Sequence, residues 1–408
     1  MPLTFLVTLV SCLLFAVYAG LIAWYHQAWR ALPPEAMPTR GTDGSGARSM
    51  PARGTDAVAA ARAVRITVLI PARNEEANIG NCLQSLAAQT YPREHFEVIV
   101  IDDHSTDGTA TIVKAFTGLT IRHLPLAELP EAGVVTAHKK FAIETGIGAA
   151  TGELIVTSDA DCVFDPDWLL TLAACYAEKG AKFLAAPVRI GGMKVWGRQH
   201  SVLFIFQTLD FITLQGITGA AVFKGVHSMC NGANLAYARE AFFEVGGFRG
   251  IDQIPSGDDM LLMHKIALRY PDRVFFLKSR SAIVSTRPET RWKGFLNQRI
   301  RWASKADRYD DKRIFWVLLL VYLVNLLFLA LAVAAFWDRW WGFLFLVLVA
   351  AKTMVEYPFV GDVAGFFGQR RLMGYFPLLQ PLHIGYTIVV GWLGKFGSYR
   401  WKDRKISK

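Results

Sequence analysis

An uncharged apolar run at the start of the chain constrains its fold most. Leu3–Ala23 holds 21 residues without a charge, and at about 1.5 Å per residue a helix of this length crosses ~30 Å of hydrocarbon. We therefore predict a transmembrane helix over residues 3–23. A cleaved signal peptide is the alternative, but no Lys or Arg precedes the run and Arg30 follows it. Six arginines between residues 25 and 65 predict that the downstream side is cytoplasmic.

Two later segments, residues 314–336 and 340–360, are also apolar. We predict that the first is a second transmembrane helix and the other a third. Lys352 and Glu356 interrupt the third segment, but their i, i+4 spacing lets them pair on one helix face, so we expect a local ion pair. The segments predict a multi-pass protein of the cytoplasmic (inner) membrane.

The last apolar segment, residues 372–394, is uncharged but contains Pro377, Gln380 and Pro381. If it crossed the membrane, the basic tail at residues 395–408 would lie outside, against the positive-inside tendency. We therefore expect a re-entrant or interfacial segment and a cytoplasmic tail, with a transmembrane helix as the alternative.

The composition is typical of a membrane protein that also has a soluble part. Hydrophobic residues make up 52% of the chain and charged residues 19%. The net charge of +10 fits nucleic acid, anionic lipid or phosphorylated substrates; the basic residues gather at membrane flanks, so we predict no nucleic-acid partner. The five cysteines are odd in number and lack the short spacing of zinc or redox motifs, which indicates a reduced compartment.

A segment of different composition follows the first apolar run. Residues 31–64 are rich in Ala, Gly, Pro, Ser and Arg, which predicts a flexible linker. From Arg65, strand-like runs such as "RITVLIPA" and "FEVIVIDD" alternate with helical patterns such as "NIGNCLQSLAAQ". This alternation predicts an α/β fold with a parallel sheet, in which ligands bind beyond the carboxyl ends of the strands.

Three predicted strands end in charged residues. "VLIPARNEE" delivers Arg73 and Glu75, "VIVIDDHSTDGT" delivers Asp103, and "ELIVTSDADC" delivers Asp159 and Asp161. Each acid alone could simply cap the next helix, but three in order are harder to explain in that way. Asp159 and Asp161 alternate as the chain leaves its strand, so both can reach one divalent cation.

With these motifs, the chain resembles the family 2 glycosyltransferases of the GT-A fold, in particular the membrane-integrated polysaccharide synthases and glycolipid-forming members. The resemblance covers residues 65–302. Its five motifs, in the family's order, are "IPARNEE", "VIDDHSTDGT", "SDADC", "SGDDMLL" and "QRIRW". It implies a GT-A catalytic domain, which is a Rossmann-like α/β nucleotide-diphospho-sugar transferase, embedded between transmembrane helices.

The resemblance also implies the residues of the donor side. These would bind the nucleotide sugar: Pro71, Arg73, Glu75, Asp103, Lys140 and Asp159. Asp103 would face uracil and Lys140 the donor phosphates, with Lys139 as the alternative because "KKF" stands where the family usually has a Gly-Lys pair. Asp159 and Asp161 would hold Mg²⁺ or Mn²⁺ against the diphosphate.

On the acceptor side, the resemblance implies that Asp259 is the base that accepts the proton of the acceptor hydroxyl. Asp258 and Asp259 could also cap the following helix, and capping is compatible with catalysis. Asn231, Gly232 and Asn234, together with Asp258, would lie near the acceptor and its sugar, although a glycine here could equally serve a turn.

The motif "QRIRW" would contribute Gln298, Arg301 and Trp302 to catalysis, with Arg neutralising diphosphate and Trp stacking on the acceptor sugar. The apolar spacing around it predicts a helix lying along the membrane interface. A plain interfacial belt of aromatic and basic residues is the alternative. Residues 202–223 are apolar but contain Asp210, so we predict a partly buried helix there instead of a span.

These implications predict an inverting, metal-dependent glycosyltransferase. It would move a sugar from a nucleotide sugar, by resemblance a UDP-sugar, to a lipid or lipid-linked glycan acceptor at the cytoplasmic face of the membrane. A processive synthase of a cell-surface polysaccharide is the alternative within the family, because both kinds of enzyme carry the Q-x-x-R-W motif. A non-catalytic membrane scaffold is the alternative of another class. The sequence names no partner subunit.

Overall fold

The computed structural model describes residues 3–35, 55–128, 137–192, 196, 201–227, 229–254, 257–304, 311–397, 399–401 and 404–406. The chain divides into two compact units. The helical unit comprises Met1–Ala31, Gln199–Ala220 and Pro288–Lys408, and the α/β unit comprises Leu32–Arg198 and Ala221–Arg287. Residues 36–54 of the predicted linker, and residues 398, 402–403 and 407–408 of the predicted tail, lie outside the described residues.

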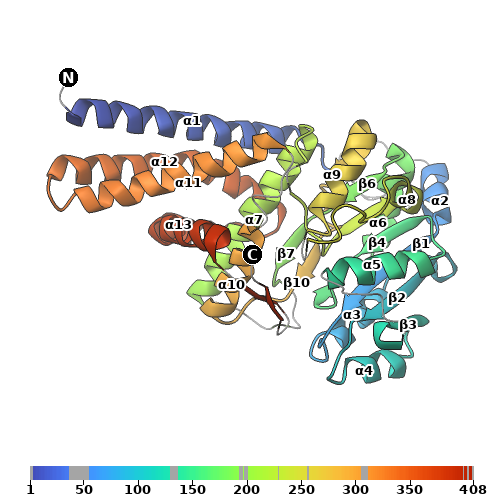
Figure 1. The fold of residues 1–408 in the computed structure, drawn as a ribbon. Helices are drawn as coiled ribbons and strands as arrows, with labels where there is room; N and C mark the ends of the chain where they lie inside the picture. Colours follow the sequence, from blue (N-terminus) through green and yellow to red (C-terminus); the bar gives the residue numbers. More distant parts are fainter. Residues whose placement is uncertain are drawn as a thin grey trace. The chain divides into compact units, whose positions relative to one another are not determined.

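A mixed sheet forms the core of the α/β unit (Figure 1). Within the described residues it has seven strands in the order β3-β2-β1-β4-β8-β6-β9. The first four run parallel, whereas β8 is antiparallel to both of its neighbours. The strand bounds are β1 Ile66–Ala72, β2 Phe96–Asp102, β3 Ile121–Pro125, β4 Leu154–Thr157, β6 Phe183–Ala185, β8 Leu235–Ala238 and β9 Val274–Phe276. The expected α/β fold is thus confirmed, with an antiparallel strand inserted.

The strand register brings the predicted motifs to one edge of this sheet. Ala72 of β1 lies opposite Asp102 of β2, and Leu69 of β1 lies opposite Thr157 of β4. Because β1, β2 and β4 run parallel, the residues that follow them leave the sheet at the same edge. A second sheet of the described residues, in the order β5-β10-β7, consists of β5 Cys162–Val163, β7 Val188–Ile190 and β10 Val284–Thr286.

The remaining elements of the α/β unit are short helices. They are α2 Thr55–Ala63, α3 Ile79–Ala87, η1 Arg93–His95, α4 Thr109–Ala115, η2 Leu126–Glu128, α5 His138–Ala149, α6 Trp168–Lys179, α8 Arg239–Glu244, α9 Met260–Arg269 and η4 Pro271–Arg273. Helix α2 corrects the predicted linker, because residues 55–63 are helical and not a flexible coil. Ala61 is fully buried, and the Tyr91 hydroxyl lies within hydrogen-bonding distance of its carbonyl oxygen, at 2.7 Å. The alanines that suggested a tether are also the strongest helix formers.

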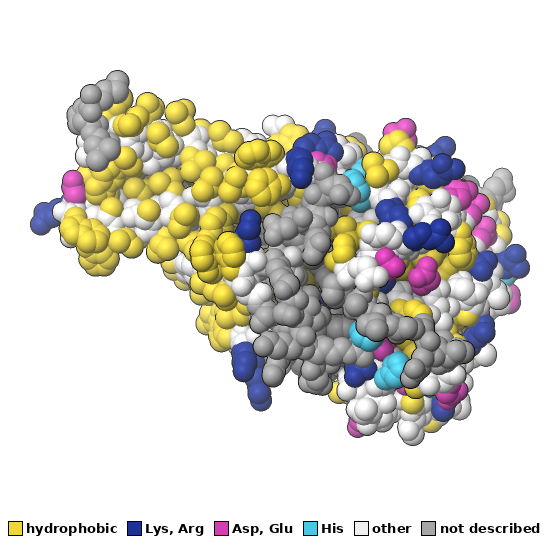
Figure 2. Space-filling model, viewed as in Figure 1, with side chains coloured by type: hydrophobic (Ala, Val, Ile, Leu, Met, Phe, Trp, Pro, Cys, Tyr) yellow, Lys and Arg dark blue, Asp and Glu magenta, His cyan; other side chains and the backbone are white. Residues whose placement is uncertain are grey.

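The helical unit holds the long apolar segments. Its elements are α1 Leu3–Ala31, α7 Val202–Phe223 (of which residues 221–223 belong to the α/β unit), α10 Trp292–Ala303, α11 Lys312–Ala334, α12 Arg339–Phe366, η6 Arg370–Tyr375, η7 Pro377–Leu379, α13 Gln380–Phe396, β11 Tyr399–Trp401 and β12 Arg404–Ile406. Figure 1 shows α1, α11 and α12 side by side. Figure 2 shows hydrophobic side chains covering the visible face of these helices.

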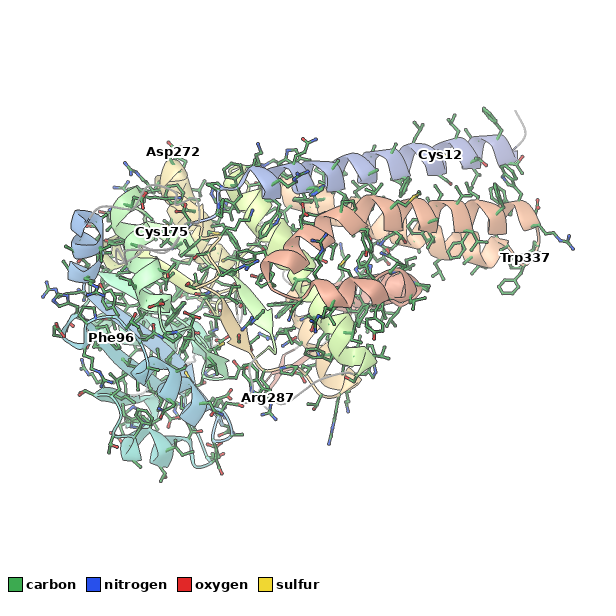
Figure 3. The ribbon with its side chains drawn as sticks, turned by 180° about the vertical axis from the view of Figure 1, so that it is seen from behind. Cys12, Phe96, Cys175, Asp272, Arg287 and Trp337 are labelled. Carbon is green, nitrogen blue, oxygen red and sulfur yellow. The ribbon has the colours of Figure 1, made fainter. Side chains whose placement is uncertain are left out.

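Four helices of the described residues are long and apolar enough to cross a membrane: α1, α7, α11 and α12. Helices α1 and α12 contain the predicted spans 3–23 and 340–360 and continue beyond them, whereas α11 begins before the predicted span 314–336 and ends within it, at Ala334. In the most apolar 18-residue stretch of α7, 61% is buried inside the protein, against 17–33% for the same stretch of the other three helices. This agrees with the expected partly buried helix. Trp337 at the turn between α11 and α12 is 80% exposed and points away from both helices (Figure 3), as aromatic residues do at a membrane interface.

The expected pair of Lys352 and Glu356 on α12 is present, with Lys352 Nζ 2.8 Å from the Glu356 carboxylate. It belongs to a larger buried network. Gln380 of α13 accepts a hydrogen bond from Lys352 at 2.6 Å and donates one to Glu356 at 2.8 Å, and the Tyr18 hydroxyl of α1 donates to Glu356. We call these four residues the polar clasp. Its partners satisfy the two buried charges, which would otherwise be costly in an apolar bundle.

Residues 372–394 do not form one continuous helix. The segment passes from the end of η6 through η7 into α13, which begins at Gln380 and has 17 residues. Pro377 begins η7, and Pro381 lies in the first turn of α13, where a missing N–H costs little. This interruption is the local structure expected from the two prolines.

Candidate active site

Side-chain hydrogen bonds join the loops that follow β1 and β2. The Asn74 N–H donates to the Ser105 hydroxyl at 3.1 Å, and the Thr106 N–H donates to Asn74 Oδ1 at 2.9 Å. Asn74 and His104 adopt left-handed backbone conformations, with φ of 52° and 58°. Residues other than glycine rarely do so, and such positions gather at functional sites. The loops that carry the predicted nucleotide residues therefore hold each other in one conformation.

Asp103 lies at the edge of the sheet among basic side chains. Arg73 Nη1 donates to the Asp103 carbonyl at 2.7 Å and lies 3.9 Å from its Oδ1. The Nδ1 atoms of His104 and His138 lie 3.0 Å and 4.0 Å from the same oxygen. Pro71, the last residue but one of β1, is partly buried and lies opposite Ile101 of β2. The Asp103 side chain is only 7% exposed, so its charge is held by its neighbours more than by water.

Lys139 joins two of the predicted acidic motifs. Its Nζ lies 2.7 Å from Asp159 Oδ1, and 3.3 Å from Asp258 Oδ2. Burial opposes the charge of this amine, but the carboxylates of Asp159, Asp258 and Asp259 outweigh burial and hold the Lys139 pKa above its ordinary value. The motif after β4 and the motif before α9 are therefore parts of one site.

The Lys140 amine makes different contacts from that of Lys139. Its Nζ donates to the carbonyl oxygens of Ile251 and Ile254, at 2.6 Å and 2.9 Å, and the residue is 2% exposed. Consecutive residues of a helix point about 100° apart, so on α5 only one of the two lysines can face the acids. Lys140 supports the loop that leads to the second acidic motif.

Asp161 lies among other acids. Burial raises the pKa of its carboxyl group to about 7, and the charges of Asp159 and Glu75 add to this effect. The Thr286 hydroxyl donates a hydrogen bond to Asp161 Oδ2 at 3.2 Å, which lowers the Asp161 pKa and so opposes the effect of burial. Thr286 was missed in the sequence because only the pairing of β10 with β5, which sets it opposite Cys162, brings it here.

The acids after β4 offer ligands for a cation. No group of three or more His, Cys, Asp or Glu side chains in the described part of the chain is arranged to hold a metal ion. Asp159 and Asp161 supply carboxylate oxygens, the ligands that Mg²⁺ and Mn²⁺ prefer. A cation on two protein carboxylates would complete its coordination with water and substrate oxygens. The raised pKa of Asp161 fits such a site, because a cation would relieve the repulsion between these acids.

Asp259 caps α9 and touches the predicted acceptor segment. Its Oδ1 accepts the Met260 N–H at 2.8 Å, and its Oδ2 accepts the Gly232 N–H at 3.2 Å. A side chain at position 232 would begin 3.2 Å from Lys139 Nζ and 3.3 Å from Asp258 Oδ2. Glycine at this position therefore lets the backbone approach the acids closely.

The two predicted asparagines differ in their surroundings. Asn231 is partly exposed, and its Oδ1 accepts the Ala233 N–H at 3.0 Å. Asn234 is fully buried: its Nδ2 donates to the carbonyls of Pro187 and Ala282, each at 2.8 Å. Its Oδ1 accepts the indole N–H of Trp168 at 3.0 Å. Asn234 thus joins segments of the core, and its role on the acceptor side stays a prediction.

Gln298, Arg301 and Trp302 lie on α10 in the helical unit, and all three are partly exposed. Gln298 Oε1 accepts a hydrogen bond from Arg299 Nη1 at 2.8 Å, and the Arg299 guanidinium lies 4.1 Å from the centre of the Trp302 ring. The expected helix is present. The catalytic roles of these three residues stay a prediction.

Comparison with known proteins identifies the family of the domain that carries most of these residues. Residues 67–246 match the family model described as glycosyl transferase family 2. This match places residues 67–246 in glycosyl transferase family 2. The matched residues include the Asp103 loop and both carboxylates after β4, and they end before Asp258, Asp259 and α10.

Curated members of the family match only over part of their length. The probable glycosyltransferase YdaM of Bacillus subtilis is 28% identical over 250 residues, which are 60% of this chain and 56% of YdaM. A beta-monoglucosyldiacylglycerol synthase of Nostoc is 33% identical over 105 residues, 26% of this chain and 22% of that protein. The chain thus matches little more than half of one relative and about a fifth of the other.

Among solved structures, the mannosyltransferase PcManGT from Pyrobaculum calidifontis superposes with a TM-score of 0.53 at 18% identity. The match covers 95% of this chain and 98% of PcManGT, whose structure is a complex with GDP-Man and Mn²⁺. At this identity the likeness concerns the fold, and it confirms the expected GT-A architecture.

Proposed function

We propose that this family 2 glycosyltransferase moves a sugar from a nucleotide sugar to a membrane lipid at the cytoplasmic face of the inner membrane. The observation that carries the proposal is the position of Lys139, whose amine lies within 3.3 Å of both Asp159 and Asp258. Transfer needs charge stabilisation for a diphosphate leaving group and a base for the acceptor hydroxyl. The contacts of Lys139 support placing both functions in one site.

The donor would bind across the edge formed by β1, β2 and β4. Pro71, Arg73, Glu75 and Asp103 would hold the nucleoside, with Asp103 accepting from the base. Asp159 and Asp161 would hold Mg²⁺ or Mn²⁺, which when bound supplies Lewis-acid stabilisation of the diphosphate. UDP is the nucleotide we propose, by resemblance to the family.

Lys139 replaces Lys140 in the proposed role at the donor phosphates. A diphosphate entering the site would offer the amine negative oxygens in exchange for those of Asp159. Because the neighbouring carboxylates keep Lys139 charged, it remains a cation throughout this exchange. The lysine would thereby stabilise the charge that develops as the bond between sugar and phosphate breaks.

Asp259 is the proposed base. The N–H groups of Gly232 and Met260 hold its two oxygens in place. The carboxylate would take the proton of the acceptor hydroxyl while that oxygen attacks the anomeric carbon from the face opposite the diphosphate. One direct displacement of this kind inverts the configuration. Asp258, Asn231 and Gly232 would border the acceptor.

The helices favour an acceptor that stays in the membrane. Helices α1, α7, α11 and α12 are each long and apolar enough to cross a bilayer, and one relative is named a synthase of a glucosylated diacylglycerol. By the family resemblance, Gln298, Arg301 and Trp302 of α10 would also take part in transfer, with Arg301 neutralising the diphosphate and Trp302 stacking on the acceptor sugar. A lipid-linked glycan would satisfy the same requirements.

The test follows labelled sugar into two products. Membranes containing the full chain are given Mg²⁺ or Mn²⁺, endogenous lipid and a panel of radiolabelled nucleotide sugars, with Asp259→Asn as the control. Label in the organic phase that Asp259→Asn abolishes supports a glycolipid-forming enzyme. Label in ethanol-insoluble material would replace this proposal by a polysaccharide synthase. Equal label in wild type and Asp259→Asn for every donor would overturn the proposed reaction and favour a scaffold.

A further inference from the structure

A buried ion pair joins α10 to α7 within the helical unit. Arg299 Nε donates to Asp210 Oδ2 at 2.9 Å, and the two side chains are 2% and 7% exposed. Around this pair, Phe295 of α10 packs against Leu203 and Phe206 of α7. The apolar contact holds the two helices together, whereas the ion pair fixes how α10 is turned about its axis.

The same guanidinium touches two members of the Q-x-x-R-W motif. Nη1 donates to Gln298 Oε1 at 2.8 Å, and the guanidinium carbon lies 4.1 Å from the centre of the Trp302 ring. The planar fork of arginine suits this combination, because it donates in its plane and stacks on its face at the same time. Arg299 therefore acts on the side-chain positions of Gln298 and Trp302, while Arg301, two residues along the helix, points about 200° away.

Stability alone accounts poorly for this arrangement. Burying an ion pair costs desolvation, and hydrophobic residues of similar size often stabilise a fold as well or better. The pair lies beside an apolar cluster that such residues could extend. A buried pair does supply one fixed geometry, and fixed geometry is what side chains facing a reacting substrate require.

We propose that Arg299 is a positioning residue of the transferase, anchored by Asp210, which holds Gln298 and Trp302 in their working orientation. The inference rests on the proposed function, in which Gln298 and Trp302 take part in sugar transfer. Arg299 itself does not touch substrate in this account. Its effect reaches the reaction only through its two neighbours on α10.

The test is a double-mutant cycle on the full chain in membranes, using Arg299→Lys and Trp302→Phe. Lysine keeps the charge for Asp210 but cannot stack on Trp302 and donate to Gln298 together. We expect Arg299→Lys to lower kcat about tenfold or more, with the donor KM and the melting temperature in detergent near wild type. In the Trp302→Phe background the same change should have a smaller effect, because the part that acts through Trp302 is already lost and only the part that acts through Gln298 remains.

Arg313→Lys is the matched control. Arg313 is 65% exposed and pairs with Asp311 at 2.7 Å near the start of α11, so kcat should stay at wild type. If the Arg299→Lys protein does not accumulate, Asp210→Asn takes its place in the cycle. Asparagine keeps an oxygen for Arg299 Nε but removes the charge of the anchor. We expect the same loss of kcat, and again less than full additivity with Trp302→Phe.

Three results would overturn the inference. They are an Arg299→Lys enzyme as active as the Arg313→Lys control, an effect that adds fully to that of Trp302→Phe, and a loss of melting temperature that accounts for all lost activity. In each of these cases a wild-type enzyme that transfers sugar leaves the proposed function intact. A wild-type protein that transfers none from any donor overturns both.

Discussion

The backbone N–H of Gly232 donates to Asp259 Oδ2 over 3.2 Å, so the acceptor segment and the proposed base are in direct contact. A Cβ atom at position 232 would lie 3.2 Å from the amine of Lys139 and 3.3 Å from Asp258 Oδ2. Both distances are tighter than ordinary van der Waals contact, so Asp258 and Lys139 would have to move.

We therefore expect Gly232→Ala to lower kcat/KM about tenfold or more, because displacing Lys139 and Asp258 by even a fraction of an ångström disturbs the alignment of the site. Stability should change by only about 1 kcal/mol, since neighbouring side chains can give way. Initial rates and thermal unfolding in detergent check this. Gly148→Ala on α5, where nothing lies within 4 Å of the new methyl group, should keep full activity; an active Gly232→Ala enzyme would contradict the tight fit.

Substitutions of the adjacent residues Lys139 and Lys140 should have different effects, one on activity and the other on stability. Lys139→Met should lower kcat/KM about a hundredfold or more, since charge stabilisation of this kind typically contributes that much. Lys140→Met should instead cost about 1–3 kcal/mol of stability, because the buried carbonyls of Ile251 and Ile254 lose a donor. Kinetics and melting curves of the two variants separate these effects. The reverse pattern would return the phosphate role to Lys140.

Glu97 should make the stability of the α/β unit depend on pH. Burial alone would raise the pKa of this carboxyl, but hydrogen bonds from the hydroxyl and N–H of Thr151 and from the Thr67 hydroxyl lower it below its ordinary 4.5. A lowered folded-state pKa stabilises the fold above the unfolded-state value, and this contribution is lost as pH falls through the lowered pKa. Glu97→Gln should thus melt below wild type at pH 7, and the two melting temperatures should converge towards pH 3. A constant gap across this range would contradict the assignment.

The polar clasp should respond unequally to single and double substitutions. Lys352→Met leaves the buried Glu356 carboxylate without its cation, which typically costs about 3–5 kcal/mol. Lys352→Met combined with Glu356→Leu removes both charges and should recover much of that loss. Thermal unfolding in detergent, together with the amount of protein in membranes, measures the difference. A double variant that is less stable than Lys352→Met would contradict this prediction. It would show that the Glu356 carboxylate stabilises the bundle even without Lys352.

Local patterns in the sequence predicted the architecture because each depends on nearby residues. Strand alternation, the acids at strand ends and the apolar spans all follow from periodicity and length. Contacts that depend on tertiary structure could not be predicted in the same way. Lys139 contacts Asp159 whereas Lys140 donates to the Ile251 carbonyl, and Asn234 accepts a hydrogen bond from the buried Trp168. The hydrogen bond from Thr286 to Asp161 depends on the pairing of β10 with β5, which no spacing in the sequence indicates.

The polar clasp also bears on the order in which the bundle is assembled. Lys352 and Glu356 are one helical turn apart, so their pair can form as soon as α12 is helical, before any other helix has docked. Helix α12 can then partition into the bilayer as an electrically neutral segment, which spares it the cost of inserting two separate charges. Tyr18 of α1 and Gln380 of α13 complete the hydrogen bonding afterwards. The pair would thus first ease the insertion of α12 into the membrane and only later help to hold the helices together.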